Sequence, residues 1–118
     1  MHPSCLYFAL KDGNVEEMME ILKNNPNLDV NWQTGSGDTA LHIACEHGRD
    51  SVVSILLAHP DIDVDLTDND GGTPFMNACD HKSTSCARLL LKDSRIEMNE
   101  PNNLGHTPLF CASERGFP

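Results

Sequence analysis

The chain has few basic residues, few aromatic residues and no long apolar run. It has only 8 Lys and Arg against 18 Asp and Glu, and its net charge of −10 argues against nucleic acid or anionic lipid as a partner. No stretch approaches the roughly 20 apolar residues that span a membrane. The N-terminus also lacks the basic segment that precedes the apolar core of a secretion signal. We therefore expect one domain that binds neither membranes nor nucleic acid.

A repeated segment is the most informative feature that is present. Near-copies lie 34 residues apart and read GDTALHIACEHG (37–48), GGTPFMNACDHK (71–82) and GHTPLFCASERG (105–116). A period of 20–50 residues indicates an array of stacked units rather than a closed globule. Each unit of such an array contacts only its neighbours, and the product is an extended surface.

Each copy predicts the same local structure. Its threonine can cap a helix, because the side-chain oxygen accepts hydrogen bonds from free amides of the first turn. Pro74 and Pro108 follow directly, where the fixed φ of proline suits a helix start. Apolar residues within 49–65 and 83–99 predict a second helix. Segments rich in Asp, Asn and Gly predict turns between the helix pairs, at 31–38, 65–72 and 99–106.

This pattern resembles the ankyrin repeat, in which a T-P-L-H-x-A motif precedes a glycine and an apolar helix. The resemblance covers nearly the whole chain, because residues 6–31 fit the same frame. It implies an all-α ankyrin-repeat solenoid of stacked helix-turn-helix units with β-turn or hairpin loops. The implied units are an N-terminal cap at 1–33, repeats at 34–67 and 68–101, and a partial fourth repeat at 102–118.

The two ends of the array differ. Glu17 and Glu20 occupy the positions of Val52 and Ile55 in the next unit, so the outer face of the first unit is acidic, as a terminal repeat requires. The fourth unit contains only one helix. Either this half repeat caps the array or the chain is a piece of a longer protein. We favour the second interpretation, because the apolar residues of that helix lack a covering second helix.

Two groups of residues resemble metal sites but lack required ligands. The segment DIDVDLTDNDGG (61–72) holds five aspartates. In a calcium-binding EF-hand frame, however, Leu66 stands where glycine is needed and Gly72 stands where the closing glutamate is needed. His47 and His81 recur beside acidic residues, but zinc needs four converging ligands or three and a water. We therefore predict no metal, no cofactor and no enzymatic activity.

The histidine and cysteines of the repeated motif are interpreted as structural. The resemblance implies that His42 bonds to the threonine of its own motif. Cys45 and Cys79 occupy the same repeat position, so we interpret them as small core residues rather than nucleophiles or disulfide partners. Free cysteines favour a reducing compartment. We expect a cytoplasmic protein, with a nuclear location as the alternative.

In ankyrin arrays, partners typically dock on the concave side, which the turn tips and the exposed ends of the first helices form. The resemblance implies partner-binding residues at Trp32, Gln33, Ser36, Asp38, Glu46, His47, Thr67, Asn69, Asp70, Asp80, His81, Asn103, Leu104 and His106. Most of them differ between copies and several are acidic, so we predict a protein or peptide partner with a basic surface. The alternatives are that the tips are merely tolerant loops and that the acidity only keeps the domain soluble.

Trp32 leaves two interpretations open. It is a binding hot spot, or it packs over the extra residue in the preceding turn. For the whole chain we predict a monomeric, non-enzymatic interaction scaffold or adaptor. The alternative is a regulatory ankyrin segment of a larger enzyme, such as a kinase or a ubiquitin ligase, that lies beyond Pro118.

Overall fold

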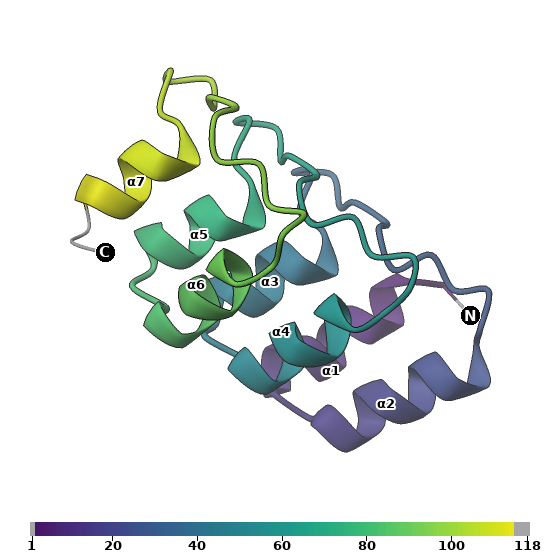
Figure 1. Ribbon diagram of the computed structural model, residues 1–118. Coiled ribbons are helices and arrows are strands. Elements are labelled where there is room, and N and C mark those ends of the chain that lie inside the picture. Colours follow the sequence, from purple (N-terminus) through teal and green to yellow (C-terminus); the bar gives the residue numbers. More distant parts are fainter. Residues whose placement is uncertain (1, 115–118) are drawn as a thin grey trace.

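The computed structural model describes residues 2–114, and within them it contains seven helices and no strand. The helices are α1 (Ser4–Asp12), α2 (Val15–Asn24), α3 (Ala40–Glu46), α4 (Asp50–Leu57), α5 (Pro74–Asp80), α6 (Thr84–Leu91) and α7 (Pro108–Glu114). The first helices of successive units, α1, α3, α5 and α7, pack side by side, and α2, α4 and α6 form a second row (Figure 1). This arrangement confirms the predicted all-α repeat solenoid. None of the described helices is long and apolar enough to cross a membrane.

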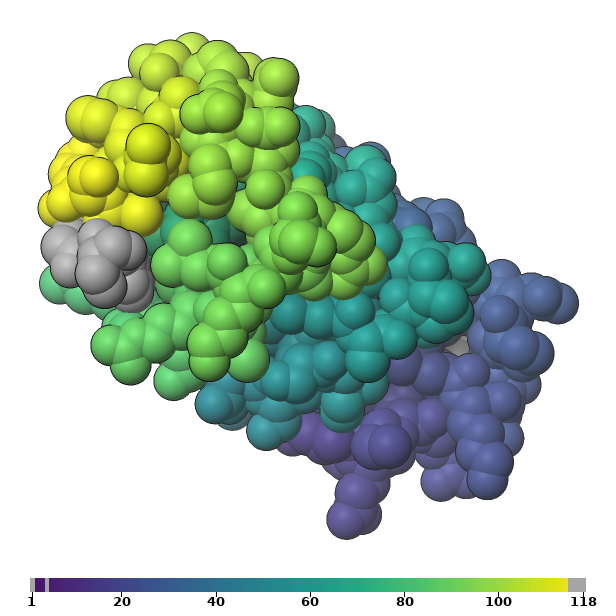
Figure 2. Space-filling model, in the orientation of Figure 1, coloured from purple at the N-terminus to yellow at the C-terminus, as the bar shows by residue number. Residues whose placement is uncertain are grey.

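The array is elongated, with extents of 40 × 25 × 24 Å, and α7 lies at the end opposite the first unit (Figure 2). Its core is thin, because small residues occupy the positions where the helices approach most closely. Ala44 and Ala78 are fully buried on α3 and α5. Phe75 on α5 and Leu90 on α6 are also fully buried and belong to the same core cluster. The core is therefore continuous from one unit to the next, as a stacked array requires.

Threonine caps α3, α5 and α7 as predicted, whereas the N-cap of α1 is Pro3. The Oγ1 atom of Thr39 accepts a hydrogen bond from the backbone N–H three residues on, at 3.3 Å. Thr73 and Thr107 accept the equivalent bond at 3.3 and 3.1 Å. Gly13 and Gly48 follow α1 and α3 with φ of 69° and 67°, in the left-handed region that glycine tolerates best.

The turns between helix pairs form three fingers, defined as residues 34–38, 68–72 and 102–106, along one edge of the array (Figure 1). In each finger the N–H of the first residue donates to the carbonyl of the last, at 2.8 to 2.9 Å. Gly37 and Gly71 have φ of 84° and 78°, and a Cβ on either would lie 2.8 or 2.9 Å from a backbone nitrogen of the next finger. Glycine is thus required there by its conformation and by the close approach of the fingers.

The ends of the array expose both acidic and apolar groups. Glu17 and Glu20 on α2 are exposed, as predicted for the cap. Phe8 on α1 is nevertheless 71% exposed, so the first unit is not polar throughout. At the other end Leu109 on α7 is 57% exposed, whereas its counterpart Phe75 is buried. The end of the third sequence copy, at 115–116, lies outside the described residues.

Candidate partner-binding surface

The predicted partner-binding residues lie at the ends of the first helices and along the fingers. Glu46 and His47 stand at the end of α3, and Asp80 and His81 hold the same place at the end of α5. All four are exposed, and Glu46 Oε1 lies 3.7 Å from His81 Nε2 across the repeat junction. In and beside the fingers, the exposed predicted residues are Gln33, Ser36, Thr67, Asn69, Asp70, Asn103 and Leu104, and the half-buried ones are Asp38 and His106.

Three of the predicted residues join neighbouring fingers through their side-chain amides. Gln33 Nε2 donates to the carbonyl of Thr67 at 2.8 Å. The side-chain amides of Asn69 and Asn103 donate to the carbonyls 34 positions earlier, at 2.9 and 3.1 Å. Their backbone N–H groups donate to the carbonyls 33 positions earlier, at 3.0 and 2.9 Å. These bonds form a ladder that positions each finger on the last. Contact of these residues with a partner stays a prediction.

Trp32 is half-buried near the N-terminal end of the array. Its ring centroid lies 5.5 Å from that of Tyr7 and 4.9 Å from that of His2. The Tyr7 hydroxyl also donates to the Trp32 carbonyl. Of the two interpretations that the sequence leaves open, this geometry supports packing. These neighbours lie on α1 and just before it, so they differ from the preceding turn that the sequence suggests.

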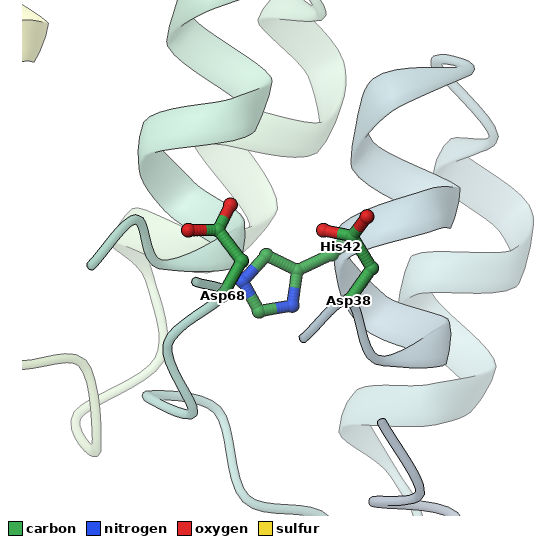
Figure 3. Close-up of side chains that lie close together, drawn as sticks. All are labelled: Asp38, His42 and Asp68. Atoms are coloured by element: carbon green, nitrogen blue, oxygen red, sulfur yellow. The ribbon is translucent and has the colours of Figure 1, made fainter. Parts of the chain in front are cut away.

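Asp38, His42 and Asp68 bring two carboxylates and an imidazole together, with possible ligand atoms within 4.8 Å of one another (Figure 3). Both nitrogens of the buried His42 ring are already bonded. Nδ1 accepts from the backbone N–H of Thr39 at 3.1 Å, so Nε2 carries the proton and donates to the Gly72 carbonyl at 2.9 Å. A metal needs an imidazole lone pair that this arrangement does not leave. We infer that His42 ties α3 to the next finger.

Burial controls the protonation of this cluster. Burial lowers the pKa of His42, although the bond to the Gly72 carbonyl and the nearby carboxylates of Asp38 and Asp68 oppose the shift. Burial also raises the pKa of Asp38, an effect that the His42 ring opposes and the Asp68 carboxylate reinforces. The neutral imidazole is the form that can accept at Nδ1 and donate at Nε2. His42 therefore supports the finger edge without a charge of its own.

A groove lies where the second and third of these fingers meet α5 and α7. It has two hollows, of about 400 and about 250 Å³, which share the lining residues Asp80, Asn102 and Leu104. The first hollow is completed by Asp68, Asp70, Gly72, Met76, Asn77 and Asn103, and the second by His106, Cys111 and Glu114. Four of these lining residues are acidic and none is Lys or Arg. We call this feature the acidic groove.

The repeat pattern agrees with a comparison to known families. A family model described as ankyrin repeats (3 copies) matches residues 2–68 and 60–118. The chain belongs to the ankyrin-repeat family. No curated protein sequence matches it. Ankyrin repeats are in general protein–protein interaction modules and typically have no enzymatic activity.

Within this ankyrin-repeat array, the sequence predicts no groove, but it does predict five of the groove-lining residues as partner contacts. It singles out Asp70, Asp80, Asn103, Leu104 and His106. It does not single out Met76 and Asn102, which complete the walls. One signal was available, because Met76 replaces His42 at the same repeat position. At that junction a flexible apolar side chain thus stands where the preceding junction has a bonded imidazole.

Proposed function

We propose that this ankyrin-repeat domain is an interaction scaffold or adaptor that binds a protein or peptide with a basic surface along its fingers. The acidic groove is the observation that carries the proposal. Asp70, Asp80 and Glu114 are exposed in its walls, and its described lining contains no Lys or Arg. Leu104 lines both hollows and is 78% exposed. A concave site with one sign of charge and an apolar contact suits a basic chain.

Charge and burial contribute differently to such binding. The carboxylates attract a basic partner over roughly 8 Å at physiological ionic strength, so they mainly raise the association rate, and this effect weakens as salt is added. The affinity rests more on a few buried anchors. Leu104 is our candidate anchor, whereas Trp32 already packs on Tyr7. The competing explanation is that the acidity only keeps the domain soluble.

Charge reversal in the groove tests the proposal. The domain would first be used to capture and identify a partner. Association rates would then be compared for the wild type and for Asp70→Lys with Asp80→Lys. We expect association to slow several-fold in low salt, with a smaller difference in high salt and little change in the urea midpoint of unfolding.

A matched control carries Glu20→Lys and Asp61→Lys, two exposed residues outside the groove lining that change the net charge by the same amount. Equal slowing in both double variants would assign the effect to net charge alone. A groove variant that associates at the wild-type rate in low salt would contradict the proposal.

A second candidate function is regulation of an enzyme that lies beyond Pro118 in a longer protein. The favouring observation is the apolar surface of α7, where Leu109 and Phe110 are 57% and 46% exposed. Their counterparts in the preceding unit, Phe75 and Met76, are almost completely buried by the stacked neighbour. The sequence of the full-length transcript tests this candidate: a downstream catalytic domain would support it, and a reading frame without one would contradict it.

We further propose a reducing location, the cytoplasm or the nucleus. Four of the five cysteines are buried and none of the five is assigned to a disulfide, which supports the proposal. Localisation of a tagged full-length protein tests it, and secretion would contradict it.

A further inference from the structure

The acidic groove differs from the rest of the finger edge in the order in which acidic and apolar side chains follow one another. Asp70 lines the first hollow, Glu114 lines the second, and Leu104 lies in the wall that the two hollows share. Asp80 also lines both. Along the groove, acidic groups therefore stand on either side of an exposed apolar side chain.

We propose that the acidic groove binds an extended peptide in which two basic residues flank an apolar residue at every second position. The first basic side chain enters the hollow at Asp70, the apolar side chain rests on Leu104, and the second basic side chain enters the hollow at Glu114. This inference rests on the proposed function and deepens it, because it names the segment of the partner that the domain recognises.

Leu104 provides the central apolar contact of the proposed site. The counterparts of Leu104 in the two preceding fingers are Ser36 and Asp70, so the finger itself does not need an apolar residue there. The backbone N–H of Leu104 donates to Asn102 Oδ1 at 2.9 Å, a turn contact that is independent of the leucine side chain. The nearby side chain of Met76 also lines the first hollow. An apolar side chain of the partner would cover Leu104, because Met76 is already almost completely buried.

The acidic groups of the groove predict the two flanking basic residues of the peptide. Asp68 Oδ1 accepts from the N–H groups of Asp70 and Gly72, at 3.0 and 2.8 Å, so Asp68 shapes its own finger. The exposed carboxylates of Asp70 and Glu114 are the groups that can meet a partner. A guanidinium or ammonium group is the complement of a carboxylate. The described lining holds four acidic residues and no Lys or Arg, so acidic groups predominate in both hollows.

The size of the two hollows and the spacing of side chains in an extended chain favour an extended peptide over a helix. Two turns of an α-helix, about 10 Å wide and about 11 Å long, occupy about 850 Å³, which exceeds both hollows, of about 400 and about 250 Å³. A single extended chain is thinner. Its alternate side chains point to the same side and recur every 6.4 to 6.8 Å, roughly twice the rise per residue of a strand. Alternate residues of an extended peptide can therefore face the groove together.

The test uses a synthetic, end-blocked peptide, Gly-Ser-Arg-Ser-Leu-Ser-Arg-Ser-Gly, and the isotope-labelled domain. We expect titration to shift the amide resonances of Asp80, Asn103 and Leu104 and of the neighbouring groove residues. A second peptide, Gly-Ser-Ser-Arg-Leu-Arg-Ser-Ser-Gly, has the same composition and charge, but its leucine points away from both arginines. It should bind several-fold more weakly.

Variants of the domain separate the two kinds of contact. Leu104→Ser introduces the residue of the first finger and should weaken the first peptide several-fold with folding intact. Asp70→Asn with Asp80→Asn should weaken it roughly two- to fivefold per carboxylate. The control, Glu20→Gln with Asp61→Asn, removes equal charge outside the groove and should change binding less than twofold.

Each contrary result has a distinct meaning. Equal binding of the two peptides, or shifts centred on the first finger, would overturn the groove assignment. The proposed function would still stand if the captured partner remained sensitive to charge reversal at Asp70 and Asp80. No shifts at millimolar peptide would also overturn the groove assignment. If charge reversal then left the captured partner unaffected, both proposals would fall.

Discussion

Replacing Lys82 with glycine should stabilise the domain. Lys82 has φ of 57°, the only positive φ of a non-glycine residue in the described part of the chain, and Gly48 holds the equivalent position with φ of 67°. The backbone contacts of Lys82 do not depend on its side chain: its N–H donates to the Cys79 carbonyl at 3.1 Å and its carbonyl accepts from Thr84 at 3.0 Å. The lysine side chain is exposed. Its substitution therefore isolates the backbone conformation.

The expected gain is the difference of two terms. A residue with a Cβ loses roughly 1–2 kcal/mol in the left-handed region. Glycine offsets roughly 0.4–1 kcal/mol of this gain, because a glycine residue loses more conformational entropy when the chain folds. From the central values of the two ranges, the free energy of unfolding should therefore rise by about 0.8 kcal/mol. With a urea dependence of about 2 kcal/mol per molar, the midpoint should rise by about 0.4 M.

Gly48→Lys is the reciprocal control. A Cβ at Gly48 would have only Ser83 Oγ as a neighbour, at 3.5 Å, so this variant adds the backbone strain without a clash. Gly13 would be a poor control, because a Cβ there would lie 3.0 Å from Arg49 Nη1. Gly48→Lys should lower the urea midpoint, and the double exchange with Lys82→Gly should approach the wild-type value. A midpoint that falls in Lys82→Gly would refute the reasoning.

Three further predictions concern pH, association and thiol chemistry. Because burial lowers the pKa of His42, the stability that this residue contributes is complete above its unfolded value and is lost as the pH falls through the folded value. The urea midpoint of the wild type should therefore decrease as the pH is lowered from about 7 to about 5.5. His42→Met, which copies Met76, should show much less of this decrease; a decrease equal to that of the wild type would contradict the role assigned to His42. Replacing Glu17 and Glu20 with leucine should change stability little but promote association, which light scattering after size-exclusion chromatography would detect; a strictly monomeric variant would count against an exposed cap face. Cys5 is exposed and should react quickly with a chromogenic disulfide reagent, whereas the four buried thiols should react only on unfolding; more than one fast thiol would show that the core opens in the native state.

The sequence predicts the backbone of this domain well because three copies report the same structure. The caps at Thr39, Thr73 and Thr107 and the left-handed Gly48 follow from residues that recur at one spacing. Their contacts are local, within a few residues along the chain. Local contacts of this kind depend on residue type more than on distant packing, and a repeat averages out the exceptions.

Contacts between repeats were harder to predict. The sequence predicts that Asn69 and Asn103 contact a partner, whereas the ladder that their side-chain amides form becomes evident only in the structure. Trp32 occurs once, so no second copy indicates its neighbours, and its packing on Tyr7 depends on how the first unit sits on the second. The acidic groove depends on side-chain volumes from two fingers and two helices. Met76 lines the groove because folding places its helix, α5, beside the second and third fingers.

The ladder of amide bonds between the fingers has a consequence for mechanical force. Its bonds join successive repeats and so follow one another along the array. Tension applied to the two ends of the array therefore acts on the junctions between repeats one after another. Each junction carries the full force, whereas the strands of a sheet pulled in shear share it. The weakest junction yields first, and the remaining repeats keep their own bonds. Each repeat of 34 residues would release about 115 Å of extended chain. Under load the domain therefore lengthens in discrete steps, as an extensible spring.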